Sequence, residues 1–124
     1  MKILVADDEE NVRNFLGSLL TTKGHKVLMS GCGNSTLKVI SAEKIDLVFL
    51  DYQMPDTNGL QVVEQLTSIK KKVKVILMSG HDITKLENEF SKHKNIIGFL
   101  PKPFELEDLK MCLQDVEISE ETNR

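Results

Sequence analysis

Four consecutive apolar residues run directly into an acid in the segment LVFLDYQMP, residues 47–55. An unbroken run of branched and aromatic residues predicts a β-strand that is buried on both faces. Pro55 and the segment Asp56-Thr57-Asn58-Gly59 predict the end of this strand and a turn. Asp51 therefore lies at the carboxyl end of a buried strand, where an unpaired charge is costly and the carboxylate should have a partner.

Composition limits the kind of protein this can be. The chain has 124 residues, 40% of them hydrophobic, which suits one domain with a substantial core. Its net charge of -3 argues against a direct nucleic-acid partner. Cys32 and Cys112 are isolated thiols without disulfide or metal-ligand spacing, which favours a reducing compartment. The chain contains neither a signal peptide nor an apolar run of membrane-spanning length, so we expect a cytoplasmic protein without a membrane partner.

Apolar periodicity predicts strands that alternate with helices. The expected strands are Ile3–Ala6, Val27–Met29, Leu47–Asp51, Val73–Met78 and Ile96–Leu100. Helical spacing is found at Val12–Leu20, Leu37–Ile40, Val62–Ile69, Ile83–Phe90 and Leu106–Val116. Because parallel neighbours need crossover connections, this alternation predicts an α/β fold with a doubly wound parallel sheet of five strands and five helices.

Several boundaries are also predicted. Asp8 is expected to cap the first helix, whose buried face should include Phe15. The lysines of the segment 70–72 should be a solvated charge at the end of the third helix and not a binding patch. Residues 1–116 are expected to form the domain, and the polar segment 117–124 a frayed or disordered tail.

Chemically active side chains follow four of the predicted strands. They are Asp7 and Asp8 after the first, Asp51 on the third, Ser79 on the fourth and Lys102 after the fifth. Parallel strands bring their carboxyl ends to one edge of the sheet, where ligands bind, so these groups should lie together. Three neighbouring carboxylates repel one another and require a cation. Because few side chains are available as oxygen ligands, Mg²⁺ that keeps several waters fits best.

This arrangement makes Asp51 a predicted phosphoacceptor. A carboxylate can form an acyl phosphate, and phosphoryl transfer depends mainly on positioning and electrostatic stabilisation. The metal, Lys102 and the Ser79 hydroxyl would each hold one phosphoryl oxygen. Taken singly, these residues could be a helix cap, a turn residue or a surface cation, so the prediction depends on their joint pattern.

The motifs, in this order, resemble the receiver domain of two-component response regulators. They are Asp7-Asp8, Asp51 with Met54-Pro55 and Gly59, Ser79-Gly80, and Lys102-Pro103-Phe104, across residues 2–116. The resemblance implies a flavodoxin-like sheet of order 2-1-3-4-5. It also implies that a histidine kinase or a histidine phosphotransfer protein donates the phosphoryl group to Asp51. Such a domain is a signalling domain and not an enzyme, and it controls a downstream protein target or an output domain.

The resemblance assigns roles to single residues. Mg²⁺ would be bound by Asp8, Asp51 and the backbone carbonyl of Gln53, with Asp7 acting through water. The peptide bond between Lys102 and Pro103 would be cis.

The same resemblance implies a switch. Ser79 would turn toward the phosphoryl group, and Phe99 would rotate from exposed to buried. Gln53 and His81 match positions that tune dephosphorylation. The surface of the fourth helix, fifth strand and fifth helix would bind a partner or form a phosphorylation-dependent homodimer.

Three other functions are compatible with parts of this pattern. A phosphatase of the haloacid dehalogenase type also uses an Asp nucleophile and Mg²⁺, but its Asp-x-Asp motif belongs after the first strand, where this chain has Asp7-Asp8-Glu9. A flavodoxin needs a hydroxyl and glycine loop at the same place. A receiver-like interaction scaffold without phosphorylation would share the fold. We expect a stand-alone receiver and not a fragment of a longer regulator.

Overall fold

The computed structural model describes residues 1–69, 71–80 and 83–122 of the chain. Within these residues, five parallel strands form one sheet in the order β2-β1-β3-β6-β7. Their bounds are β1 (Lys2–Ala6), β2 (Lys26–Ser30), β3 (Leu47–Asp51), β6 (Lys74–Ser79) and β7 (Ile96–Pro101). Counted along the chain, this is the order 2-1-3-4-5, so the predicted flavodoxin-like fold is confirmed.

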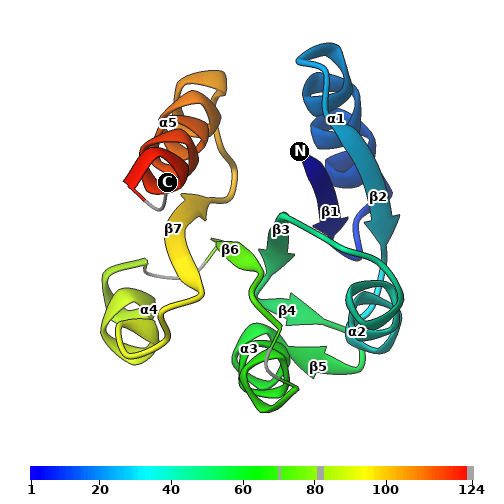
Figure 1. Cartoon of the computed structure of the whole chain (residues 1–124), viewed down its shortest axis with the longest axis vertical. Helices are drawn as coiled ribbons and strands as arrows, with labels where there is room; N and C mark the ends of the chain where they lie inside the picture. The colour runs from blue at the N-terminus through cyan, green and yellow to red at the C-terminus, as the bar shows by residue number, and fades with distance from the viewer. Residues whose placement is uncertain (70, 81–82, 123–124) are drawn as a thin grey trace.

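The described part of the chain also contains five helices, which cover both faces of the sheet (Figure 1). Their bounds are α1 (Glu10–Thr22), α2 (Gly33–Ala42), α3 (Gly59–Ser68), α4 (Ile83–Phe90) and α5 (Leu106–Thr122). Helices α1 and α5 lie on one face, and α2, α3 and α4 lie on the other. A short antiparallel pair, β4 (Gln53–Met54) and β5 (Thr57–Asn58), occupies the segment where only a turn was predicted.

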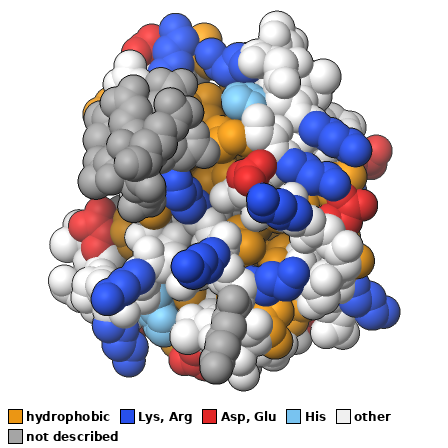
Figure 2. Space-filling view, viewed as in Figure 1, with side chains coloured by type: hydrophobic (Ala, Val, Ile, Leu, Met, Phe, Trp, Pro, Cys, Tyr) orange, Lys and Arg blue, Asp and Glu red, His pale blue; other side chains and the backbone are white. Residues whose placement is uncertain are grey.

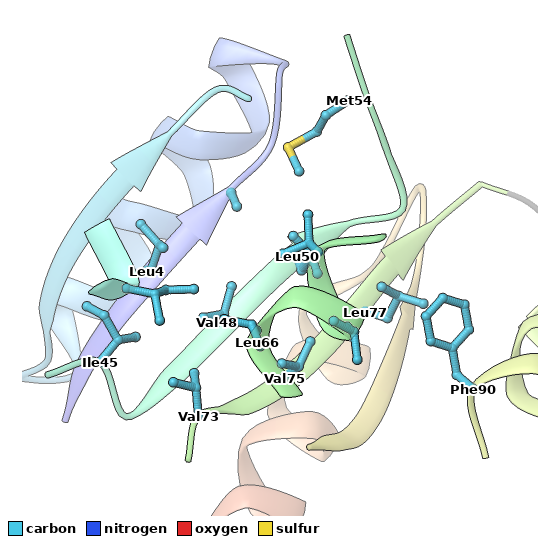
Figure 3. Close-up of a cluster of buried hydrophobic side chains, with 14 of the residues drawn as sticks. Leu4, Ile45, Val48, Leu50, Met54, Leu66, Val73, Val75, Leu77 and Phe90 are labelled. Atoms are coloured by element: carbon cyan, nitrogen blue, oxygen red, sulfur yellow. The ribbon is translucent and has the colours of Figure 1, made fainter. Parts of the chain in front are cut away.

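The central strand β3 explains why the core has two halves. All five of its residues are buried, as the apolar run predicts. Successive side chains of a strand point to opposite faces. Val48 and Leu50 therefore pack with Phe90 beneath α2, α3 and α4 (Figure 3), whereas Leu47 and Phe49 pack beneath α1 and α5. Asp51 is the last residue of the same strand, so its backbone is fixed by both halves of the core.

The start of α1 differs from the prediction. Its N-cap is Glu9 and not Asp8, and no side chain of the N-cap makes a capping hydrogen bond. Asp7 takes over part of this role, because its Oδ1 accepts a hydrogen bond of 2.8 Å from the Glu9 N–H. The helix ends at Thr22, and Gly24 follows the C-cap residue Lys23 with φ of 92°, a conformation that favours glycine.

Two further expectations are wrong. Phe15 is 52% exposed and not buried, because it lies at the margin of the apolar stripe and contacts Phe104, with 6.0 Å between ring centroids. The segment from Glu117 does not fray at once: α5 continues to Thr122. Backbone hydrogen bonds can extend a helix beyond a residue that is packed in the core, such as Val116, and glutamate is a good helix former.

Lysines gather at the amino-terminal edge of the sheet. Lys2, Lys26 and Lys74 begin strands, and others follow the ends of helices: Lys23, Lys44, Lys71, Lys72, Lys92 and Lys94. Lys and Arg side chains are spread over the face seen in Figure 2. Helices that connect parallel strands have their C-terminal ends at this edge, where positive charge is favourable to the helix dipole. The described lysines of the predicted solvated run, Lys71 and Lys72, are thus part of a wider basic edge.

Candidate functional site

The opposite, carboxyl edge of the sheet brings the predicted acids together. Asp7 and Asp8 follow β1, and Asp51 ends β3. One carboxylate oxygen from each of the three lies within 4.8 Å of the others. Asp51 and Asp8 line a cavity of about 400 Å³ together with Gln53 and Lys102. The convergence that strand topology predicts is therefore present in the structure.

Lys102 is the cation that faces these acids. Its Nζ lies 2.8 Å from Asp7 Oδ2, 3.3 Å from Asp51 Oδ2 and 3.6 Å from Glu9 Oε1. Burial alone would lower the pKa of Lys102, but the hydrogen bond to Asp7 and the charge of Asp51 outweigh it, so that the pKa is raised. The lysine therefore stays charged. Glu9 was not predicted as a site residue, although its place in a run of four acids is a signal.

This environment strongly shifts the pKa of Asp51. Burial, and after it the Asp7 carboxylate, raise its pKa from 3.8 to about 7, although the charge of Lys102 opposes both effects. The N–H of Gln53 lies 3.4 Å from Asp51 Oδ1 and gives weak additional support. Three carboxylates beside one lysine leave two uncompensated negative charges. This donor set fits a hard divalent cation with oxygen ligands.

The backbone around Asp7 shows how the site is held in place. Asp7 is fully buried. Its N–H donates to the Ser30 carbonyl at 3.1 Å, and its own carbonyl accepts from the Arg13 guanidinium at 2.6 Å. These contacts tie the end of β1 to β2 and to α1, so the buried carboxylate keeps a fixed position beside Lys102.

Comparison with known proteins agrees with this geometry. Residues 3–114 match the family described as the response regulator receiver domain. The chain belongs to this family. Receiver domains are signalling domains of two-component systems, which work with histidine kinases and output domains.

Relatives differ in how much of their length the receiver represents. Sporulation initiation phosphotransferase F of Bacillus subtilis is 26% identical over 88% of this chain and 87% of its own length. Response regulator MprA of Mycolicibacterium vanbaalenii is 33% identical over 88% of this chain and 47% of its own. DNA-binding transcriptional regulator NtrC of Azospirillum brasilense is 32% identical over 86% of this chain and 22% of its own length. The chain thus spans less than half of two of these relatives.

Solved structures show the same fold. Response regulator protein TrrA from Thermotoga maritima, in complex with Mg(2+)-BeF, is 29% identical with a TM-score of 0.80, over 93% of this chain and 97% of that one. Chemotaxis response regulator CheY4 of Vibrio cholerae is 25% identical with a TM-score of 0.82, over the same shares. Among the described helices of the receiver, none has the length and apolar character to cross a membrane.

The remaining predicted residues of the receiver lie as follows. Ser79 is buried at the end of β6, and its carbonyl accepts the Lys102 N–H at 2.8 Å. Phe99 is half-buried on β7 against the core of the α2, α3 and α4 face. Gln53 is exposed and lines the cavity. His81 lies outside the described residues. The peptide bond between Lys102 and Pro103 is cis, as the resemblance implies.

Proposed function

We propose that Asp51 accepts a phosphoryl group from a histidine kinase or a histidine phosphotransfer protein. The observation that supports this most is the meeting of Asp7, Asp8 and Asp51 with Lys102 at the carboxyl edge of the sheet. Since Asp51 lies on β3 and not on β1, and the chain belongs to the receiver family, the haloacid dehalogenase alternative lacks support.

The transfer needs a nucleophile and a way to stabilise charge. An Asp51 carboxylate oxygen would form a bond to phosphorus while the phosphorus–nitrogen bond of the phosphohistidine breaks, and the imidazole would leave with that electron pair and take up a proton. Lys102 Nζ, 3.3 Å from Asp51 Oδ2, is placed to stabilise the charge on the incoming phosphoryl oxygens. Asp7 would hold Lys102 in this position through its 2.8 Å ion pair.

The acidic cluster would hold Mg²⁺. Asp8, Asp51 and the backbone carbonyl of Gln53 are the proposed ligands, with Asp7 acting through water. The ion would supply positive charge that offsets the phosphoryl group and the neighbouring carboxylates.

Signal output would follow from a change at β6 and β7. The Ser79 hydroxyl would bond the phosphoryl group, and Phe99 would become more buried. Phe99 is a backbone neighbour of Leu77 in the sheet, two residues before Ser79, so the two switch positions lie on adjacent strands. The surface of α4, β7 and α5 would then bind a downstream target, an output domain or a second copy. Gln53 and His81 would tune the loss of phosphate, and the protein would work in the cytoplasm.

The test is the intact mass after incubation with acetyl phosphate, with and without Mg²⁺. Wild type should gain the mass of one phosphoryl group only with Mg²⁺, and Asp51→Asn should gain none. Asp46→Asn removes an acid near the opposite edge of the sheet and should behave as wild type. A wild type that gains no mass under any condition and does not bind beryllofluoride would instead be a receiver-like scaffold.

A further inference from the structure

The loop after Asp51 carries the Gln53 carbonyl and has a tip that contacts α2. It covers residues 52–59, and its antiparallel pairs are Gln53 with Asn58 and Met54 with Thr57. The Gly59 N–H donates to the Tyr52 carbonyl at 2.6 Å and closes the base of the loop. Pro55 and Asp56 are the two residues of the turn at its tip.

Asp56 binds the N-terminus of α2. Its Oδ1 accepts the Gly33 N–H at 2.8 Å, and its Oδ2 accepts the Asn34 N–H at 2.9 Å. The first N–H groups of a helix have no partner within the helix, and they attract negative charge. These hydrogen bonds, first that of Asn34 and then that of Gly33, lower the pKa of Asp56. The N-cap residue Cys32 makes no side-chain capping hydrogen bond, so the cap of α2 comes from a distant loop.

Gly33 allows the loop and the helix to approach each other. It is buried, and a methyl group in place of its hydrogen would overlap the Thr57 Cγ2 methyl. On the other side, the Thr57 hydroxyl donates a hydrogen bond to Gln61 of α3. The tip of the loop is therefore held between α2 and α3.

Beside Asp51, Tyr52 is held firmly, because its N–H donates to the Met78 carbonyl at 2.8 Å and its carbonyl accepts the Gly59 N–H, but Gln53 is held less closely. The Gln53 side chain is exposed, and the Gln53 N–H reaches Asp51 Oδ1 only at 3.4 Å. Since this bond is long, the backbone at Gln53 depends on the anchors of the loop for its position. Asp56 supplies two hydrogen bonds of good length, assisted by its charge.

We propose that Asp56 and Gly33 are positioning residues for the metal site. By fixing the tip of the loop against α2, they fix the Gln53 carbonyl that would bind Mg²⁺. This inference rests on the proposed function and extends it, because it gives α2 a part in metal binding although α2 supplies none of the proposed ligands.

The first experiment is calorimetric titration of Mg²⁺ into wild type, Asp56→Ala and Asp46→Ala. Loss of a residue that orients a metal ligand typically weakens metal binding by about tenfold, and we expect this for Asp56→Ala. Asp46 is a matched control, because its carboxylate also accepts a backbone N–H, that of Lys2 at 2.8 Å, but near the amino edge. Asp46→Ala loses the same charge and should bind Mg²⁺ as wild type does.

A second set of variants separates positioning from a general loss of stability. Gly33→Ala should weaken Mg²⁺ binding because its methyl group displaces Thr57. Thr57→Ala alone loses the hydrogen bond to Gln61 but keeps both Asp56 hydrogen bonds, so it should weaken Mg²⁺ binding less than Gly33→Ala does. The double variant Gly33→Ala/Thr57→Ala should bind Mg²⁺ more tightly than Gly33→Ala, since the overlap with Thr57 Cγ2 is removed and the contacts that remain, with Thr57 Cβ and Asp56 Oδ1, are 3.3 Å. This comparison also tests the positioning role if Asp56→Ala does not fold.

The outcomes are distinct. If wild type binds Mg²⁺ and both Asp56→Ala and Gly33→Ala bind it equally well, the positioning role is wrong while the proposed function stands. Failure of the double variant to recover affinity would also reject the role. If wild type itself binds no Mg²⁺, the proposed metal site is wrong, and the positioning role with it.

Discussion

Replacing Asp51 by asparagine should make the metal-free protein more stable, even though it removes the proposed phosphoacceptor. Burial and the Asp7 carboxylate raise the pKa of Asp51 from 3.8 to about 7 in the folded protein. A carboxyl group with a higher pKa in the folded than in the unfolded state disfavours folding when it is ionised. This penalty is absent below about pH 4, grows between about pH 4 and 7, and is complete above that range.

The size of the effect follows from the two pKa values. Their difference of about 3 corresponds to roughly 4 kcal/mol. Asp51 lines an open cavity, so solvent screening should reduce this to roughly 1 to 2 kcal/mol. Asparagine has nearly the same volume, and its carbonyl oxygen can still accept the hydrogen bond from Lys102. We therefore expect Asp51→Asn to raise the free energy of unfolding by roughly 1 to 2 kcal/mol near pH 8, and to change it little near pH 4.

Urea denaturation followed by circular dichroism, with a chelator present, measures this difference. Asp56→Asn is the control of opposite sign: hydrogen bonds from Asn34 and Gly33 lower the pKa of Asp56, so loss of its charge should lower stability. Added Mg²⁺ should stabilise wild type more than Asp51→Asn, because a ligand stabilises the state that binds it. An Asp51→Asn protein that is less stable than wild type without metal, or whose difference does not change with pH, would refute the reasoning.

Three other perturbations have defined outcomes. Lys102→Ala should retain Mg²⁺ binding in calorimetry but lose most phosphoryl uptake from acetyl phosphate; uptake at the wild-type rate would make Lys102 only a structural cation. Gly59→Ala would place a Cβ 2.9 Å from Leu77 Cδ1, and thermal denaturation should show a loss of about 1 to 3 kcal/mol. Cys112, whose pKa burial raises to about 11, should react with a thiol reagent much more slowly than Cys32, whose pKa is lowered by the hydrogen bond between its side chain and that of Ser35; equal rates would contradict this.

The fold could be predicted because its strands are short apolar runs with acids or turns at their ends. All residues of the segment 47–51 are buried, which is what its unbroken apolar run predicts for a central strand. The meeting of Asp7, Asp8 and Asp51 could be predicted as well, because parallel strands must share a carboxyl edge.

Other features depend on contacts that local sequence does not encode. Strands β4 and β5 have two residues each, too few for any periodicity to appear. Asp56 caps a helix that begins 23 residues earlier in the chain, so no local capping pattern could show it. Phe15 has the spacing of a buried residue, but the width of the covered stripe depends on how α1 packs against the sheet.

The two edges of the sheet carry opposite charge, and this affects how the molecule orients itself toward a charged partner or surface. Most lysines lie at the amino edge, and the acids of the cluster lie at the carboxyl edge, so the net charge of -3 hides a permanent dipole along the strands. An approaching phosphodonor with a positive surface would be turned to meet the carboxyl edge first, and salt would weaken this orientation. For the same reason the basic edge should retain this acidic protein on a cation-exchange resin at low salt.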